Sequence, residues 1–257
     1  MILSLVQVEV FFFILARIAG VFIQAPIFSS RSFFTSAKVA LVIWLTIVLW
    51  FVTPVTNHLP TSLVAFLFIL ISEVAVGFLM GFICNILFVA IQAAGEFMDM
   101  QMGLSVAQAL DPVFGSVISI IGRLTFFTAL VVFLVMDGHH LLLAGLHQSF
   151  TTLPAGQLAN FASPGLAQQL IALGSTLWLT GIKLAAPIVL LIFLADFTFG
   201  IVSRVAPQVN VFMLGFQVKP LLGLFGFSLI LPFLVKYIEK SLELMGTEMV
   251  KLAVFIK

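Results

Sequence analysis

Long apolar runs with almost no charge dominate this sequence and exclude a soluble fold. Of its 257 residues, 62% are hydrophobic and only 8% are charged, whereas a soluble domain carries about 25% charged residues. This composition indicates an integral membrane protein. Because an open strand would leave backbone groups unpaired in lipid, we expect every run to be a helix. The runs cover residues 10–23, 39–52, 63–94, 124–136 with a continuation at 141–146, 166–202 and 221–235.

The lengths of these runs fit a single bilayer crossing poorly. A spanning helix needs about 20 residues to cross roughly 30 Å of hydrocarbon. Runs 39–52 and 221–235 are shorter than this, whereas 63–94 and 166–202 would extend roughly 48 Å and 55 Å as continuous helices. Either sister proteins cover part of this surface, which indicates a subunit of an assembly, or the long runs break internally. In the fifth run such breaks would fall at Gly174 or Pro187.

Five ionisable residues lie within or at the edge of the apolar runs. Each charge near a helix centre costs about 2.5–3.5 kcal/mol in lipid, so each needs a partner. Their mixed signs and scattered positions favour polar contacts between subunits over a proton or ion relay, while snorkelling from a helix end suits Asp196 best. Glu9 and Arg17 are roughly 12 Å apart along one helix, so their partners lie on other helices or chains. The five are Glu9, Arg17, Glu73, Lys183 and Asp196.

Lys and Arg in the connecting segments predict the orientation. With six crossings, one side collects Arg31, Lys38, Arg123, Arg204 and Lys219. The excess of cations in cytoplasmic loops places these segments in the cytoplasm and both termini outside. The lysines of the C-terminal tail, after residue 235, argue the other way.

Three shorter patterns predict local structure. Gly77 and Gly81 in GFLMG are four residues apart, a spacing that lets two helix backbones approach closely. The segment DGHH, residues 137–140, reads as a polar helix break rather than a metal site, because no HExxH or Cys/His set accompanies it. From residue 92 onward, an amphipathic and methionine-rich stretch indicates either a surface that adapts or seals, because methionine side chains are flexible, or an interfacial helix and its loop; Asp111-Pro112 would end the helix.

Nothing in the sequence points to catalysis. It contains no nucleophile–base pair, Walker loop or GxGxxG motif, so we expect no catalytic residue, no cofactor and no bound metal. A formal net charge of +1 argues against nucleic acid as a partner. The sole cysteine, Cys84, lies in an apolar run and is expected to be a small core residue.

Four stretches together resemble one family, the R component of the flagellar type III export gate (FliR), with its SctT relatives in virulence systems. They are ARIAGVFIQAPIF, GEFMDMQMGLSVAQALDP, DGHHLLLAGLHQSFTTLP and RVAPQVNVFMLGFQVK, and they follow one another in the family's order. The resemblance covers nearly the whole chain. One difference is visible: Gln217 stands where the family often has proline, and a proline follows instead at Pro220.

The resemblance implies an all-α membrane protein built from kinked helical hairpins, as one membrane-associated unit. A P-like portion would cover about 1–165 and a Q-like hairpin about 166–257. It implies a non-enzymatic subunit of a hetero-oligomeric helical export gate in the bacterial inner membrane, at the flagellar basal body. The implied partners are P and Q proteins (FliP-like and FliQ-like), a cytoplasmic gate component of the FlhB type, unfolded flagellar proteins and membrane lipid.

Two segments are the expected functional sites. The first is a shaped bend at the cytoplasmic end of the Q-like hairpin, whose amides and cations offer donors to neighbouring subunits; a plain cation-bearing loop is the alternative. Its residues are Arg204, Pro207, Gln208, Asn210, Phe212, Gly215 and Lys219, which join Glu9, Arg17, Glu73 and Lys183 as expected contacts between subunits. The second is a plug that the resemblance implies at Asp111, Pro112, Val113, Phe114, Gly115, Ser116, Val117 and Ile118.

Two other functions compete with an export subunit. A secondary transporter for a small solute predicts internal repeats around a mid-membrane site, and the two halves of this chain show no clear repeat. A structural membrane scaffold is the third possibility. An export subunit should be unstable alone and soluble with its partners, whereas a transporter should be stable alone and bind its solute.

Overall fold

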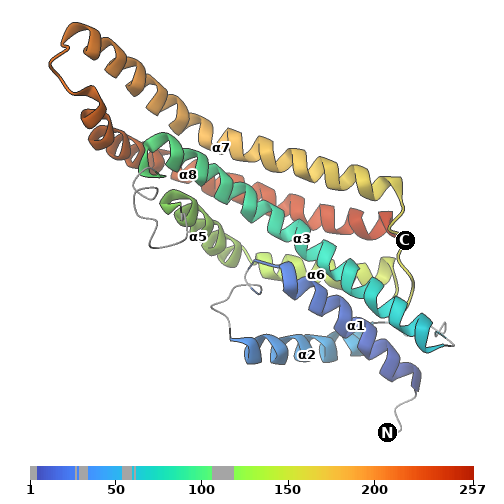
Figure 1. The fold of residues 1–257 in the computed structure, drawn as a ribbon. Helices are drawn as coiled ribbons and strands as arrows, with labels where there is room; N and C mark the ends of the chain where they lie inside the picture. The colour runs from blue at the N-terminus through green and yellow to red at the C-terminus, as the bar shows by residue number, and fades with distance from the viewer. Residues whose placement is uncertain (1–4, 27, 29–33, 54–59, 61, 106–118) are drawn as a thin grey trace. The chain divides into compact units, whose positions relative to one another are not determined.

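The computed structural model describes residues 5–26, 28, 34–53, 60, 62–105 and 119–257, and the regular structure of these residues is entirely α-helical (Figure 1). This confirms the predicted all-α class. The helices are α1 (Leu5–Gln24), α2 (Thr35–Val52), α3 (Leu63–Met102), α5 (Ile120–Val135), α6 (Gly138–Thr152), α7 (Pro164–Val205) and α8 (Val211–Phe255).

Three of these helices are far longer than one bilayer crossing. Helices α3, α7 and α8 contain 40, 42 and 45 residues, which corresponds to roughly 60–68 Å at about 1.5 Å per residue. Helix α7 continues through both Gly174 and Pro187, so the alternative in which the fifth run breaks there is wrong. A proline removes one backbone hydrogen bond, and the intact turns on either side keep the helix continuous.

The last helix also exceeds its prediction, which gave only residues 221–235. Helix α8 includes Pro220 and Pro232 and extends to Phe255, so most of the expected tail, with Lys236, Lys240 and Lys251, is helical. Hydropathy alone misses this end because it is amphipathic: buried and charged residues alternate at helical spacing. The buried positions include Leu234, Ile238, Leu242, Met245, Met249 and Leu252.

Residues 92–102 of the methionine-rich stretch form the end of α3. Met98 and Met102 are fully buried within the protein, while Met100 is exposed. The helix ends at Met102, and Gly103 follows with φ +80°, a left-handed conformation that stops helices and favours glycine. The continuous helix α3 therefore ends before Asp111-Pro112; Leu104 and Ser105 are again helical, and the predicted end at Asp111-Pro112 lies outside the described residues.

The chain divides into two compact units. The first comprises Met1–Leu87, Met136–Gly174 and Ser241–Lys257. In it, Trp50 of α2 donates a 3.1 Å hydrogen bond to the carbonyl of Gln7 on α1. The connection between α6 and α7 is tied to the end of the chain, since the Asn160 amide donates to the Ile256 carbonyl at 2.8 Å.

The second unit comprises Phe88–Val135 and Ser175–Lys240. Its packing includes the ring of Phe88 against Phe133 and a 2.6 Å hydrogen bond between Thr180 and Tyr237. The start of α5 is held twice, because Ser119 Oγ accepts from the Gly122 amide and the buried Asp99 accepts from the Ile121 amide. The predicted division of the chain into a P-like portion, about 1–165, and a Q-like hairpin, about 166–257, is a different division from these two units. It stays a prediction.

Within the part of the chain that the structure describes, five helices are long and apolar enough to cross a membrane: α1 from Val6, α2, α3, α7 and α8. Helices α5 and α6 together add a sixth crossing if the pair is one broken span. The break between them falls at Asp137, which has a left-handed φ of 56°. This confirms the helix break predicted at DGHH.

Candidate functional site

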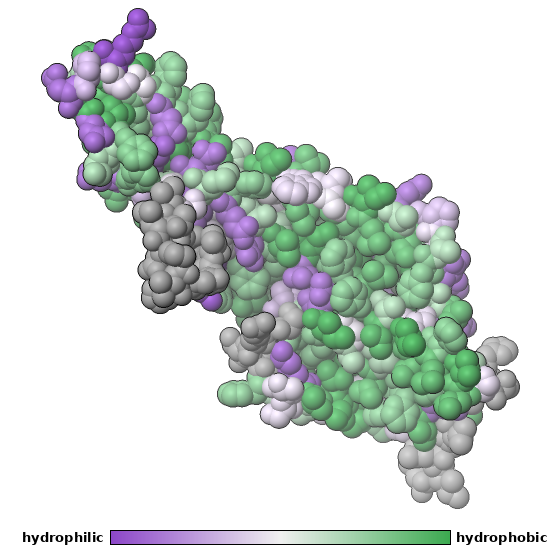
Figure 2. All heavy atoms as spheres, viewed as in Figure 1, coloured by the Kyte–Doolittle hydropathy of each residue, from purple (hydrophilic) through white to green (hydrophobic). Residues whose placement is uncertain are grey.

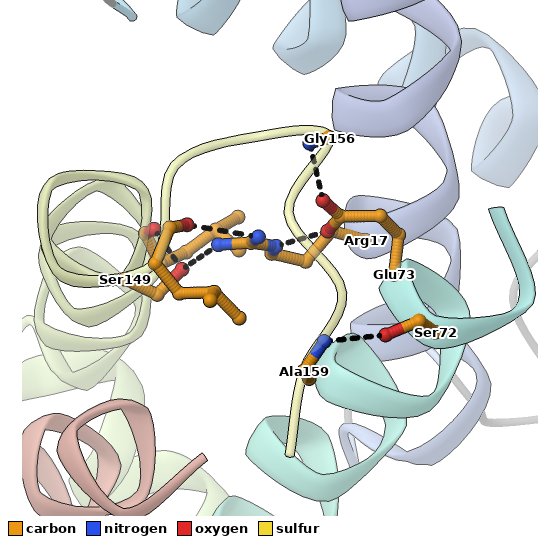
Figure 3. Close-up of polar contacts among 8 residues, drawn as sticks. Arg17, Ser72, Glu73, Ser149, Gly156 and Ala159 are labelled. Atoms are coloured by element: carbon orange, nitrogen blue, oxygen red, sulfur yellow. Dashed lines mark hydrogen bonds and ion pairs between the residues drawn. The ribbon is translucent and has the colours of Figure 1, made fainter. Parts of the chain in front are cut away.

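A fully buried arginine organises the first unit. Arg17 of α1 donates through Nε to Glu73 of α3 at 2.6 Å, through one terminal nitrogen to Ser149 Oγ and through the other to the Leu153 carbonyl, both at 3.0 Å (Figure 3). Its guanidinium carbon also lies 4.1 Å from the centre of the Phe150 ring. Ion pairing, hydrogen bonds and a cation–π contact together compensate the loss of water around this charge.

The second oxygen of Glu73 ties down the connection between α6 and α7. It accepts a 3.0 Å hydrogen bond from the Gly156 amide, while the neighbouring Ser72 hydroxyl accepts one from the Ala159 amide at 3.1 Å (Figure 3). Irregular backbone buried in a membrane-type protein must find such partners. Glu73 therefore links α1, α3 and the segment that leads into α7.

Close approach of α1 and α3 places Arg17 beside Glu73. A Cβ added at Gly77 would clash with the backbone of Arg17, and one added at Gly20 would clash with the backbone of Val74. The prediction that Gly77 and Gly81 permit close helix packing is confirmed, since a Cβ at Gly81 would likewise meet α1.

The other ionisable residues in the apolar runs are placed differently from the buried Arg17–Glu73 pair. The expectation that the partner of Arg17 lies on another helix is met, and that helix belongs to the same chain. Glu9 is half-buried, and its Oε2 is buried without a hydrogen-bond partner among the described residues. Lys183 is exposed on α7. That contacts between subunits involve these residues stays a prediction for Glu9, Arg17, Glu73 and Lys183.

The connection between α7 and α8, residues 206–210, is shorter than the predicted bend. Arg204 lies in the last turn of α7, where a cation complements the helix dipole. Pro207 and Gln208 are exposed in the connection. Asn210 caps α8 by accepting a 3.1 Å hydrogen bond from the Met213 amide. The amide nitrogen of Asn210 is not needed for this cap, so it can donate to another group.

The other predicted bend residues lie within α8. Phe212, Gly215 and Lys219 belong to its first three turns, which corrects their assignment to a bend. Lys219 instead forms a 2.5 Å ion pair with Asp196 of α7. Asp196 is thus paired within the hairpin, and the alternative that it snorkels from a helix end stays a prediction. The pair is partly exposed, with 26% and 44% of the two side chains accessible.

A groove of about 580 Å³ adjoins this ion pair in the second unit. Its walls combine methionine and phenylalanine side chains with small residues and a few polar groups. The lining includes Met100, Met102, Phe199, Phe212, Phe216 and Lys219. The rings of Phe212 and Phe216 meet edge to face at 4.7 Å. Sequence reasoning missed this groove, because it requires α3, α7 and α8 to come together.

Apolar side chains cover much of the outer surface, as the view in Figure 2 shows. On α2 only Leu45 and Thr46 are buried. On α7, Trp178, Leu179, Leu190 and Phe197 are each more than half exposed. Such a surface is stable only against lipid or against other proteins.

The predicted plug, Asp111–Ile118, lies outside the described residues. No role was predicted for two polar contacts at the start of α5: the Ser119 cap and the hydrogen bond to the buried Asp99 carboxylate. Serine directly before an apolar run is a recognisable N-cap signal. The contact from Asp99 has no such signal, because it spans 22 positions of sequence.

The apolar helices and embedded charges indicate a membrane protein, and comparison with known proteins shows that its class is that of bacterial export proteins. Residues 8–245 match the family described as "Bacterial export proteins, family 1". The chain is 31% identical to "Flagellar biosynthetic protein FliR" of Pectobacterium carotovorum over 90% of its own length and 88% of the relative. It is 30% identical to the protein of that name from Bacillus subtilis, over 81% of each.

A virulence-system protein is also similar. "Yop proteins translocation protein T" of Yersinia pestis is 32% identical over 57% of this chain and 56% of the relative. The chain therefore belongs to the FliR family of bacterial export proteins, as the sequence motifs predict. It is a component of a type III export apparatus, and the comparisons do not favour the small-solute transporter.

Proposed function

We propose that this chain is the R-type subunit of a flagellar type III export gate in the bacterial inner membrane, at the basal body. It assembles there with P and Q proteins (FliP-like and FliQ-like) and with a cytoplasmic component of the FlhB type. Together these subunits form the passage for unfolded flagellar proteins. The chain contributes structure to this passage and carries out no chemical step.

The observation that carries the proposal is an exposed charge in the middle of an exposed apolar helix face. Lys183 is the sole charged residue between Leu177 and Ala195. Leu179 and Leu190, one and two turns away on the same side, are 55% and 58% exposed. An ammonium within an apolar surface costs about 2.5–3.5 kcal/mol at the centre of a lipid-facing helix. A neighbouring subunit that supplies an acceptor removes this cost.

The backbone at this position adds a second polar group. Pro187 has no amide hydrogen and so cannot donate to the carbonyl of Lys183, four residues earlier. A partner helix packed here could pair with the ammonium and also donate to this carbonyl. On α1, the half-buried Glu9 has an oxygen, Oε2, without a hydrogen-bond partner among the described residues, and this carboxylate is a further acceptor for a neighbouring subunit.

Co-purification of the tagged chain with its P and Q partners tests this proposal, with Lys183→Leu as the decisive variant. If the face contacts a subunit, Lys183→Leu leaves the partner's acceptor buried and unpaired, and the yield of complex falls. If the face contacts lipid, removing the charge leaves the yield unchanged or raises it. Lys257→Leu, at the exposed end of the chain, is the matched control. Normal complex yield and motility with Lys183→Leu would contradict this use of α7.

The connection between α7 and α8 is the proposed contact with the P and Q chains at the cytoplasmic side. Arg204→Glu combined with Gln208→Ala and Asn210→Asp removes the donors and keeps an acceptor that can cap α8. This variant should lose assembly or export while its hairpin stays folded. Wild-type swimming by the triple variant would remove the proposal for this segment.

Residues 111–118 are the proposed plug on the strength of the family resemblance alone. Val113, Phe114, Val117 and Ile118 are apolar and suited to exclude water and ions from a narrow passage. Deleting 113–118 should make cells that express the gate leak small ions. Unchanged membrane conductance in cells that assemble the deleted gate would refute the plug.

A further inference from the structure

Three potential metal ligands converge where α5 ends and α6 begins. Asp137 Oδ1 lies 3.4 Å from His140 Nδ1 and 4.0 Å from His139 Nε2. One oxygen and two nitrogens from these side chains all lie within 4.8 Å of one another. The sequence pattern DGHH predicts only a helix break, because its spacing matches no established metal motif. The structure adds the convergence of the three side chains, which sequence spacing does not reveal.

Backbone geometry accounts for this convergence. Asp137 has φ 56° and ψ 29°, a left-handed conformation that aspartate adopts more readily than most residues. The turn sets the carboxylate beside the first turn of α6, which carries both histidines. Their rings lie 4.2 Å apart between centroids, at an angle of 40°. The Asp137 carboxylate makes no cap hydrogen bond to α6, so its oxygens are available to a cation.

We propose that Asp137, His139 and His140 form a binding site for a divalent transition-metal ion of the zinc class. Tetrahedral ligands at about 2.0–2.1 Å from Zn²⁺ lie roughly 3.3 Å from one another; the two separations from Asp137 are 3.4 Å and 4.0 Å and all three ligand atoms lie within 4.8 Å of one another, so side-chain rotations can bring them to this spacing. Imidazole nitrogens favour Zn²⁺, Ni²⁺ and Cu²⁺ over Mg²⁺ and Ca²⁺. Three protein ligands leave a fourth position for water or a group from another molecule.

The exposure of each ligand fits an accessible site. The side chains of Asp137 and His140 are 69% and 67% exposed, and that of His139 is 35% exposed. His139 Nδ1 is buried without a hydrogen-bond partner among the described residues, so Nε2, the nitrogen nearer Asp137, is the one that a metal can reach. The positive end of the α6 dipole opposes a cation here, and the carboxylate of Asp137 offsets it.

Metal binding to the purified full chain, alone or with its partners, tests the proposal. The protein is stripped with a chelator and titrated with Zn²⁺ against a chromogenic zinc indicator. Wild type should bind one Zn²⁺ per chain. Asp137→Asn, His139→Ala and His140→Ala should each weaken binding by at least about tenfold, the loss that even an outer partner of a metal site can cause.

His147→Ala is the matched control, because His147 lies on the same helix outside the cluster, and this variant should bind as wild type does. Equal binding by all four variants, or no stoichiometric binding by wild type, would overturn the site. X-ray absorption on the Zn²⁺-loaded wild type gives a readout independent of any variant's folding. Two imidazoles in its spectrum support the site, and none refutes it. The result does not depend on export, so it stands apart from the assembly experiments.

Discussion

Arg17 Nε and Glu73 Oε2 lie 2.6 Å apart, with the two side chains 0% and 1% exposed. The pair joins α1 to α3, and every nitrogen of the guanidinium has an acceptor within the same unit. A charge so enclosed is stable only while its partner is present, which makes each residue a sensitive test of the packing.

Arg17→Met or Glu73→Gln should lower the free energy of unfolding by about 3–5 kcal/mol, because either change leaves a buried charge unpaired. The double variant should be less unstable than the sum of the two single variants. Denaturant unfolding of the detergent-solubilised protein measures this cycle. Glu96→Gln, at an exposed position of α3, is the control and should change stability by no more than about 0.5 kcal/mol. Additive losses in the double variant would contradict direct coupling.

Gly77→Ala should separate α1 from α3, because the added methyl meets the Arg17 backbone, which cannot yield. Gly174→Ala is the opposite case, since a methyl there meets no described atom within 4 Å. Alanine in a helix interior is favoured over glycine by about 0.8–1.0 kcal/mol. Thermal unfolding should therefore show a lower midpoint for Gly77→Ala and an equal or higher one for Gly174→Ala. The reverse order would contradict the close crossing.

Asn210→Ala should fray the first turn of α8, because it removes the acceptor for the Met213 amide. Loss of an N-cap costs about 1 kcal/mol. Hydrogen exchange should become faster at Met213 and its neighbours, and Asn210→Asp should restore the wild-type rate. If Asn210→Ala exchanges as slowly as wild type, the cap is not what holds this turn.

Cys84 should resist maleimide in the folded protein and react once the protein is denatured, because its side chain is fully buried. Ser203→Cys adds a thiol at an exposed position of α7 and should label in both states. The mass of the labelled protein reports the number of thiols that react. Labelling of Cys84 in the native wild type at the rate seen for Ser203→Cys would show that α3 is not packed as described.

Composition and hydropathy predict the all-α class well, and they fail where a helix stops being apolar. Residues 236–255 are helical because charges and buried side chains alternate along them, and a hydropathy average treats this pattern as a polar tail. The end of α3 at Met102 was not predicted, for a different reason. Asp111-Pro112 is a strong breaker and lies outside the described residues, whereas the left-handed Gly103 already interrupts the helix at Met102.

The polar contacts were only partly predictable. The sequence shows that Arg17 and Glu73 each need a partner. It cannot show that they pair with each other, since they are 56 positions apart. In the same way, Lys219 and Asp196 pair across a hairpin whose register no motif specifies. The glycine pair on α3 was predictable because its spacing has a direct geometric meaning.

The left-handed turn at Asp137 bears on which side of a membrane each end of the chain emerges. Among the described helices, α1, α2, α3, α7 and α8 count as one crossing each. If α5 and α6 together make one further crossing, the total is even and residues 5 and 257 share a compartment. If the pair enters and leaves by the same leaflet, the total is odd and the ends are separated by the bilayer. The path of the chain through Asp137 thus decides which compartment receives the lysines of α8. It also decides the charge asymmetry between the two faces of the membrane.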